Sequence, residues 1–392
     1  MKLRFNLLAA LLLLGASLLA QSTLDQVLAA VKVNNKTIQA GERRIEAGKA
    51  LFQTGLSLPD PSISFDWMLG VPSAAGNQTD LIVAQGFDFP TVYKYRRELA
   101  GLKTGQSGLN EEQILKEVLL EAKLTALHLV YLNKHKAEME RRLASTQQFY
   151  SGYQKKLEQQ DATIIDVNKA RLQLLNLQTS LQLLEVEITG HLQELAVFNG
   201  GISVEFTDTI YPFQPDLPDF EMLKQTIEQN DPRLRFLNTQ QQIGEAETRL
   251  TRALLMPKFE AGYRYQGLLD QQFHGIHAGI SLPLWENKKR IASSELQVGV
   301  YSALIDKHRT EYDHEIERLY TQYRAFHRSI QDYRTNLGLV SNQAFLDKAL
   351  EAGQITVLEY FTEISLYYES LDRYLALEAM MHKTVARLMK FY

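Results

Sequence analysis

The side chains best suited to chemistry in this sequence are histidines, because the chain of 392 residues contains no cysteine. The missing thiols exclude a thiolate nucleophile, a thiolate metal site and disulfides. His274 and His277 are the close histidine pair of the sequence. Residues three apart on a strand point to opposite faces, so joint ligation of one metal ion is unfavourable. We therefore predict no metal site and no cofactor.

Acidic side chains are abundant, but their arrangement is not typical of catalysis. A Gly-x-Ser-x-Gly elbow, a phosphate-binding loop and an HExxH motif are all absent from the sequence. The acids mix with bases at salt-bridge spacings, as in the run from Glu138 to Arg142. Such a run is typical of a solvated helical face. The sequence therefore predicts a protein that is not an enzyme.

Two carboxylates, Asp166 and Glu359, recur in the same local setting. Thr163-Ile164-Ile165-Asp166 returns as Thr356-Val357-Leu358-Glu359, and each acid is expected near the start of a helix. The simpler interpretation is that each carboxylate caps its helix or interacts favourably with the helix dipole. The dipole interaction stabilises the helix by about 0.3–1 kcal/mol.

The match is part of a repeat, because the second half of the chain follows the first 193 to 196 positions later. Residues 61–65 return as 257–261, and residues 87–90 return as 280–283. Solenoid units run to only about 20–50 residues, so one larger unit was duplicated. We expect a signal peptide at 1–20, a first structural repeat at 21–201, a linker at 202–218 and a second repeat at 219–392.

The first 20 residues predict export from the cytoplasm. Basic Lys2 and Arg4 precede an apolar run from Leu7 to Leu19 and a small residue, Ala20. This order is typical of a secretory signal peptide. Loss of the two basic residues takes the net charge from −4 to −6, and such mild acidity does not indicate nucleic acid as a partner.

Each repeat predicts the same five elements. The helices are indicated by apolar residues at helical spacing, and the strands by alternation of apolar and polar residues. We expect helices at 23–56, 91–150 and 163–198 and strands at 62–69 and 81–89, then helices at 220–255, 287–352 and 356–391 and strands at 258–265 and 275–282.

The strands predict contact with lipid on one face. Asp66, Asp88, Glu260 and Arg264 occupy the other face, which indicates lipid outside and water inside. Four strands cannot close a barrel, and an open sheet edge is not tolerated in lipid. The chain is therefore expected to give a fraction of a barrel to an oligomer, a dimer with 8 strands or a trimer with 12. The expected lipid-facing residues are Ile63, Phe65, Trp67, Phe87, Phe89, Phe259, Tyr263 and Tyr265.

The doubled order of helix, strand, strand, long helix and return helix resembles the outer-membrane efflux proteins of the TolC type. Residues 163–171 are similar to the family pattern T-x-x-D-V-x-x-A-R, and residues 353–359 to its G-x-x-T-x-x-D counterpart. The resemblance implies a mainly α fold with a membrane β-barrel portion: a homotrimer with a 12-stranded barrel and a long helical barrel. It also implies a location in the outer membrane of a Gram-negative bacterium, in contact with lipid and extending into the periplasm. The implied partners are a periplasmic adaptor (membrane fusion) protein and an inner-membrane pump, and the implied activity is passive conduction of substrate to the cell exterior.

The resemblance also implies two kinds of site. The helix–helix turns would form the periplasmic tip that docks on the adaptor, at Gln160, Asp161, Ala162, Gly353, Gln354 and Ile355. Glu359, Thr362, Glu363 and Asp166 would line the channel constriction, where threefold rings of carboxylates select cations. Gln160 stands where a glycine would match Gly353, so we expect the first turn to be shaped differently.

Three other interpretations remain. A soluble protein could pack the apolar faces of its strands against its helices. A periplasmic coiled-coil adaptor or structural spacer without a pore would need a compact sheet between two helices. A secreted enzyme on a helical scaffold would need a catalytic constellation, which the sequence lacks.

Overall fold

The computed structural model describes residues 23–212, 217–283, 288–339 and 343–391. The predicted signal peptide and part of the predicted linker lie outside these ranges. The described residues form two compact units, which we call the helical unit (those within 1–39, 114–230 and 313–392) and the sheet unit (those within 40–113 and 231–312). Each unit takes segments from both halves of the sequence. The division into two repeats therefore stays a prediction about the sequence.

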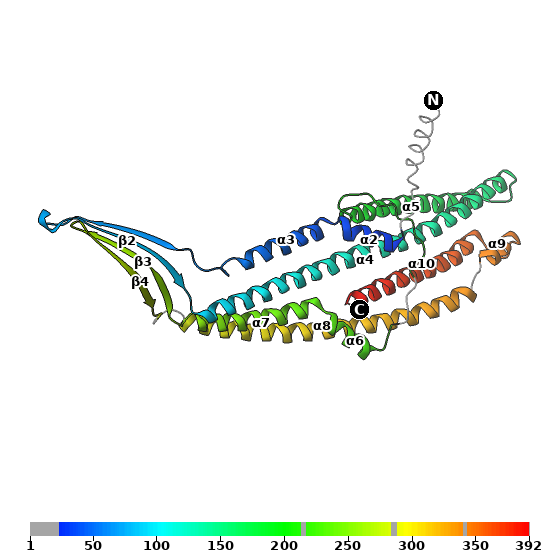
Figure 1. Ribbon diagram of the computed structural model, residues 1–392. Coiled ribbons are helices and arrows are strands. Elements are labelled where there is room, and N and C mark those ends of the chain that lie inside the picture. Colours follow the sequence, from blue (N-terminus) through cyan, green and yellow to red (C-terminus); the bar gives the residue numbers. More distant parts are fainter. Residues whose placement is uncertain (1–22, 213–216, 284–287, 340–342, 392) are drawn as a thin grey trace, which may run out of the picture. The chain divides into compact units, whose positions relative to one another are not determined.

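The helices and strands follow the predicted order twice (Figure 1). The first half contains α2 (Leu24–Asn34), α3 (Lys36–Gln53), β1 (Ser62–Met68), β2 (Gln78–Phe87), α4 (Pro90–Glu158) and α5 (Ile164–Phe198). The second half contains α6 (Phe220–Asn230), α7 (Pro232–Ala253), β3 (Lys258–Leu268), β4 (Gln271–Ser281), α8 (Lys288–Leu339), α9 (Gln343–Glu351) and α10 (Val357–Leu388). Short 3-10 helices lie at Ser73–Ala75 and Met389–Phe391.

The first helix of each repeat is broken into two, so the prediction of single helices at 23–56 and 220–255 was wrong. A buried side chain causes each break. The Asn35 side-chain oxygen accepts from the N–H groups of Thr37 and Ile38 at 2.9 and 3.1 Å. Asp231 accepts from the Arg233 N–H at 2.8 Å, and Pro232 begins α7. Such side chains replace the missing helical partners, which lets a new helix begin at that point. The predicted helix at 287–352 is likewise described as two helices, α8 and α9.

The sheet unit contains one antiparallel sheet of four strands in the order β1-β2-β3-β4. The register places Ile63, Val83, Tyr263 and Ile276 in one row, and Ser64, Ile82, Arg264 and Gly275 in the adjacent row. Because side chains alternate along a strand, these rows lie on opposite faces. The four strands are consecutive and antiparallel, so β1 and β4 are the two edges of the sheet.

The helical unit has a core between α2, α4 and α5. Val31, Leu127, Leu129 and Leu195 are each 0% exposed there. Burial of such a side chain stabilises the fold by about 1.5–3 kcal/mol. Asn35 also donates from its side chain to the carbonyl of Phe198 at 2.8 Å, which joins the end of α2 to the end of α5.

Candidate functional site

Two helix–helix turns lie at the same end of the helical unit, between α4 and α5 and between α9 and α10 (Figure 1). In the first turn, Gln160 N–H donates to Leu157 O at 3.1 Å and Asp161 N–H donates to Lys156 O at 2.8 Å. In the second turn, the corresponding bonds run from Gly353 to Leu350 and from Gln354 to Ala349, also at 3.1 and 2.8 Å. Both patterns are Schellman motifs, which end a helix with one left-handed residue.

The expectation that the first turn is shaped differently was wrong. Gln160 has a φ of 64° and Gly353 has a φ of 67°, so both residues adopt the left-handed conformation. A residue with a Cβ atom adopts this conformation at a cost of roughly 1–2 kcal/mol. The hydrogen bonds of the motif offset this cost at Gln160, because they satisfy carbonyl groups at the end of α4.

Asp166 and Glu359 each complete a capping box at the helix that follows the turn. The Thr163 hydroxyl donates to Asp166 at 2.6 Å, and the Thr356 hydroxyl donates to Glu359 at 2.9 Å. Each carboxylate also accepts from the backbone N–H of its threonine, at 3.2 and 2.8 Å. The Thr356 backbone N–H and then its hydroxyl lower the pKa of Glu359. The simpler interpretation of the T-x-x-D/E pattern, helix capping, is therefore confirmed.

The predicted constriction residues lie near these caps but are not brought into one cluster by a single chain. Thr362 and Glu363 are exposed on the first turns of α10, and the Thr362 hydroxyl donates to Leu358 O at 2.8 Å. Asp166 and Glu359 each accept hydrogen bonds from the threonine at the start of their own helix. A shared site of these groups would need other copies of the chain, so the constriction stays a prediction.

An aromatic cluster holds the end of α4 against the start of α10. The ring of Phe149 lies 5.2 Å from that of Tyr360, 5.0 Å from that of Phe361 and 4.5 Å from that of Tyr153. Tyr360 also donates its hydroxyl to Asp347 on α9 at 2.8 Å. Burial, and then Asp347, raise the pKa of Tyr360 well above its usual range. The hydroxyl therefore stays protonated and keeps α9 and α10 joined.

A charged clamp joins the same two helices farther from the turns. Arg142 on α4 is 5% exposed and donates to both carboxylate oxygens of Asp372 on α10, at 2.7 and 3.0 Å. It also donates to Glu138 at 3.2 Å, and its guanidinium lies 4.2 Å from the centre of the Tyr368 ring. Two parallel bonds between guanidinium and carboxylate fix direction as well as distance. The clamp therefore sets how α10 lies along α4.

In the sheet unit, the predicted lipid-facing residues share one face, with one exception. Ile63, Phe65 and Trp67 on β1 are 73%, 65% and 61% exposed, and Phe259 and Tyr263 on β3 are 42% and 45% exposed. Phe87 and Tyr265 lie on the same face and are half-buried. The prediction for Phe89 on a strand was wrong, because β2 ends at Phe87 and Pro90 begins α4.

The opposite face of the sheet carries polar groups. Arg264 on β3 donates to Asp80 on β2 at 3.2 and 2.9 Å. Glu260 and His277 approach each other on this face to 3.8 Å. His274 lies on the apolar face, opposite Tyr265, so His274 and His277 point to different faces as the spacing predicts. The sheet is thus apolar on one side and charged on the other.

The structure also assembles a group that the sequence did not predict. His128 on α4 meets Glu187 and His191 on α5, with one ligand atom from each within 4.8 Å of the others. The spacing of Glu187 and His191 puts them on one helix face, but only the packing of α4 on α5 brings in His128.

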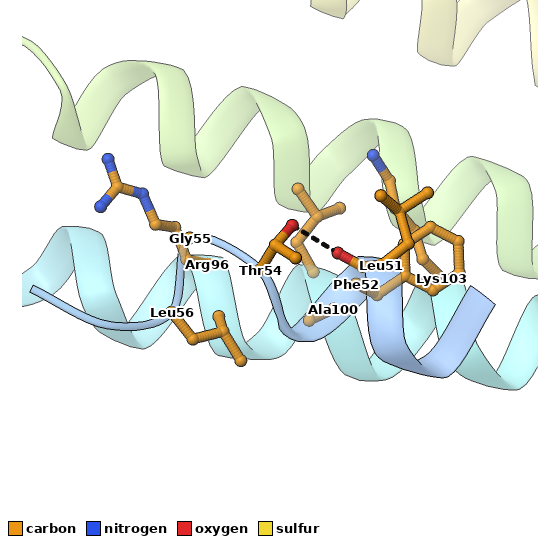
Figure 2. A pocket seen from close by; sticks show the side chains of 9 residues that line it. Leu51, Phe52, Thr54, Gly55, Leu56, Arg96, Ala100 and Lys103 are labelled. Atoms are coloured by element: carbon orange, nitrogen blue, oxygen red, sulfur yellow. Dashed lines mark hydrogen bonds between the residues drawn. The ribbon is translucent and has the colours of Figure 1, made fainter. Parts of the chain in front are cut away.

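A depression of about 240 Å³ lies in the sheet unit between the end of α3 and α4 (Figure 2). The polar side chains among the residues that line it are already engaged. Thr54 donates to Leu51 O at 2.6 Å, Arg96 pairs with Asp88 at 2.7 Å and Lys103 pairs with Glu247 at 2.8 Å. No acid, base and nucleophile converge in this depression.

None of the described helices combines the length and the apolar composition that a membrane crossing requires.

No protein-family model and no curated protein sequence matches the chain. Solved structures match it over nearly its whole described length. It is similar to CusC, described in terms of transmembrane channel formation, with a TM-score of 0.79 over 95% of this chain and 92% of that one at 13% identity. It is also similar to the outer-membrane channel OprN, with a TM-score of 0.76 over 95% of this chain and 90% of that one at 13% identity. Its similarity to the CmeC outer membrane channel of Campylobacter jejuni has a TM-score of 0.71 over 94% of this chain and 84% of that one, at 13% identity.

The chain therefore has the fold of outer-membrane channel proteins. The resemblance of its sequence to TolC-type proteins is confirmed at the level of the fold, as is the prediction of a mainly α chain with four strands.

The clamp predicts a difference between adjacent arginines. Arg142→Met should lower the free energy of unfolding by roughly 1–3 kcal/mol, because it removes hydrogen bonds between charged groups and leaves Asp372 with only His135 nearby among the described residues, at 3.6 Å. Arg141→Met should change it by less than about 0.5 kcal/mol, since surface substitutions usually do. Arg141 is the matched control, with a side chain that is 76% exposed and also pairs with Glu138. Denaturant unfolding followed by circular dichroism measures both, and equal effects would contradict the role of the clamp.

Proposed function

We propose that this chain is one protomer of a homotrimeric outer-membrane channel in a tripartite efflux or secretion system. The trimer conducts substrate passively from a periplasmic adaptor and an inner-membrane pump to the cell exterior. The observation that carries the proposal is a four-stranded sheet with one exposed apolar face and two open edges, within the fold of outer-membrane channels. The match to proteins described as channels also supports the absence of a catalytic role.

The sheet is suited to a shared barrel. Strands β2, β3 and β4 have 10, 11 and 11 residues, and about 9–11 residues cross a bilayer at a tilt. Strand directions alternate through the sheet, so β4 is antiparallel to β1. The β1 edge of one copy can therefore pair with the β4 edge of the next in the same antiparallel pattern. Three copies give 12 strands, and the resemblance to TolC-type proteins favours this number over the 8 strands of a dimer.

The exposed face argues against a soluble protein with its sheet packed on helices. Ile276 is 93% exposed and Ile63 is 73% exposed, at the two ends of the same row across the sheet. A packed sheet would hide these side chains. The sheet combines two strand pairs, each from between its own pair of helices, whereas an adaptor without a pore would need one compact sheet between two helices.

The tip and the constriction belong to the same proposal. The two Schellman turns present matched backbone shapes at one end of the helical unit, which supports a docking surface that an adaptor contacts in two equivalent ways. Glu359 is exposed and its capping bonds hold it charged at neutral pH. In a trimer, three such carboxylates near the axis would attract cations.

The lipid-facing assignment predicts the effect of charge on the apolar face. Phe65→Arg or Trp67→Arg should destabilise the assembled barrel by roughly 2–4 kcal/mol at mid-bilayer, and by less near an interface. Ser64→Arg, on the opposite face of the same strand, is the matched control and should cost much less. Heat- or denaturant-induced dissociation of the trimer in lipid measures the effect. Equal sensitivity of both faces would contradict the assignment.

The tip assignment predicts a loss of efflux from one glycine. Gly353→Val should lower efflux, because a β-branched residue does not adopt the left-handed conformation easily and the docking turn would change shape. Trimer formation and membrane insertion should be unchanged. Gln160→Gly is the control, since it keeps the same conformation without strain and should retain efflux. Dye efflux from cells and cross-linking to the adaptor measure both, and unaltered values for Gly353→Val would place docking elsewhere.

The constriction assignment predicts a change in ion preference. Glu359→Gln should reduce the preference for cations and weaken block by multivalent cations in single-channel recordings, because it removes a ring of charge. Thr356→Ala separates charge from capping, since it removes the capping hydroxyl and keeps the carboxylate. It should leave ion preference unchanged. If Glu359→Gln conducts like the parent, or if Thr356→Ala has the same effect, Glu359 is a cap and not part of a charged ring.

A further inference from the structure

Two histidines and a glutamate converge between α4 and α5 in the helical unit. Each of His128, Glu187 and His191 offers one ligand atom, and these three atoms lie within 4.8 Å of one another. The rings of His128 and His191 are edge to face with their centres 4.6 Å apart. His128 Nε2 lies 3.5 Å from a carboxylate oxygen of Glu187. Two imidazoles and a carboxylate form a common ligand set of zinc.

We infer that His128, Glu187 and His191 bind a divalent transition-metal ion, with Zn²⁺ as the representative, which bridges α4 to α5. Bonds of about 2.0–2.2 Å in a tetrahedral site place ligand atoms about 3.3 Å apart. The three atoms lie within 4.8 Å of one another, so they must move closer together to reach this spacing. Three protein ligands leave a fourth position for water. Nitrogen-rich ligand sets favour such ions over Mg²⁺ and Ca²⁺, which prefer oxygen.

The hydrogen bonds around the two rings leave nitrogens available for an ion. His191 Nδ1 is engaged with Glu194 at 2.9 Å, so Nε2 is the nitrogen left for a ligand bond. A carboxylate on the second nitrogen is the usual way in which proteins orient a ligating histidine. His128 Nδ1 is buried and has no hydrogen-bond partner among the described residues. Its Nε2 is the nitrogen that faces Glu187, at 3.5 Å, so Nε2 is the ligand atom in this ring orientation.

Charges from α10 act on the same place. Lys383 on α10 is basic and interacts electrostatically with both His128 and Glu187. Lys383 therefore opposes a cation at this site and competes for Glu187. Its removal should strengthen metal binding, which a structural role of the three residues would not predict.

The test uses full-length protein without an affinity tag, in detergent, titrated with Zn²⁺ by calorimetry. The parent should bind one Zn²⁺ per chain at this site, and its melting temperature should rise, since an ion that binds only the folded chain stabilises it. His128→Gln, Glu187→Gln and His191→Gln should each weaken the affinity more than about tenfold, a loss that even supporting residues of metal sites produce. Lys383→Gln should tighten it.

A matched control is His314→Gln, which removes an exposed histidine that has a glutamate partner at 3.7 Å but is not part of the cluster. It should bind Zn²⁺ like the parent, and excess Mg²⁺ should not compete. Glu187 is half-exposed, so Glu187→Gln tests the site without disturbing the core. Parent-like affinity in the Glu187 and His191 variants, or no Zn²⁺ binding by the parent, would overturn the inference. Because no channel measurement is involved, either result leaves the proposed conduction untouched.

Discussion

The hydrogen-bonding groups at the two edges of the sheet are the constraint on which the proposed assembly depends. β1 and β4 are each paired on one side, so each presents a row of N–H and C=O groups on the other. In lipid such groups cost several kcal/mol each when they have no partner. The apolar face carries Phe65 and Ile276 outward, which makes water an equally poor surrounding for that face. Both demands are met together if identical copies pair edge to edge with the apolar face toward lipid.

In the helical unit, backbone hydrogen-bonding groups at the helix ends also need partners. Gln160 and Gly353 end their helices in the same left-handed conformation, and Thr163 and Thr356 begin the next helices with the same capping box. Asn35 and Asp231 break the first helix of each repeat by the same kind of side-chain cap. The two halves thus share equivalent turns and helix caps at corresponding positions. These equivalent positions agree with the predicted repeat.

The sequence was sufficient for the order of the elements and for the two faces of the sheet. Alternation of apolar and polar residues is a property of each strand by itself, so Ile63, Phe65 and Tyr263 could be assigned to one face without tertiary information. Phe89 was misplaced because strand alternation continued past the point where Pro90 begins a helix. Asp231-Pro232 is typical of a helix start, but the helical pattern on both sides of it favoured the prediction of one continuous helix. Asn35 gave no comparable signal.

Other features depend on contacts that no local pattern records. The left-handed conformation of Gln160 follows from the hydrogen bonds that Gln160 and Asp161 make to the end of α4. A glutamine in the sequence does not by itself indicate this conformation. The clamp of Arg142 and Asp372 joins residues from the two halves of the chain. His128 meets Glu187 and His191 only because α4 packs on α5. The carboxylates that the sequence singled out are, in one chain, helix caps.

Cysteine cross-linking can test whether β1 of one copy pairs with β4 of the next, because the chain has no cysteine of its own. One cysteine replaces Ser64 on β1, and a second is scanned over Phe273, Gly275 and His277 on the same face of β4. Within one chain these edges are about 14 Å apart, three strand spacings, which is too far for a disulfide. We expect at least one pair to give a covalent trimer in membranes and no larger species, while single-cysteine controls stay uncrosslinked. Absence of any link between chains, or an open-ended ladder of larger species, would contradict a barrel closed by three copies.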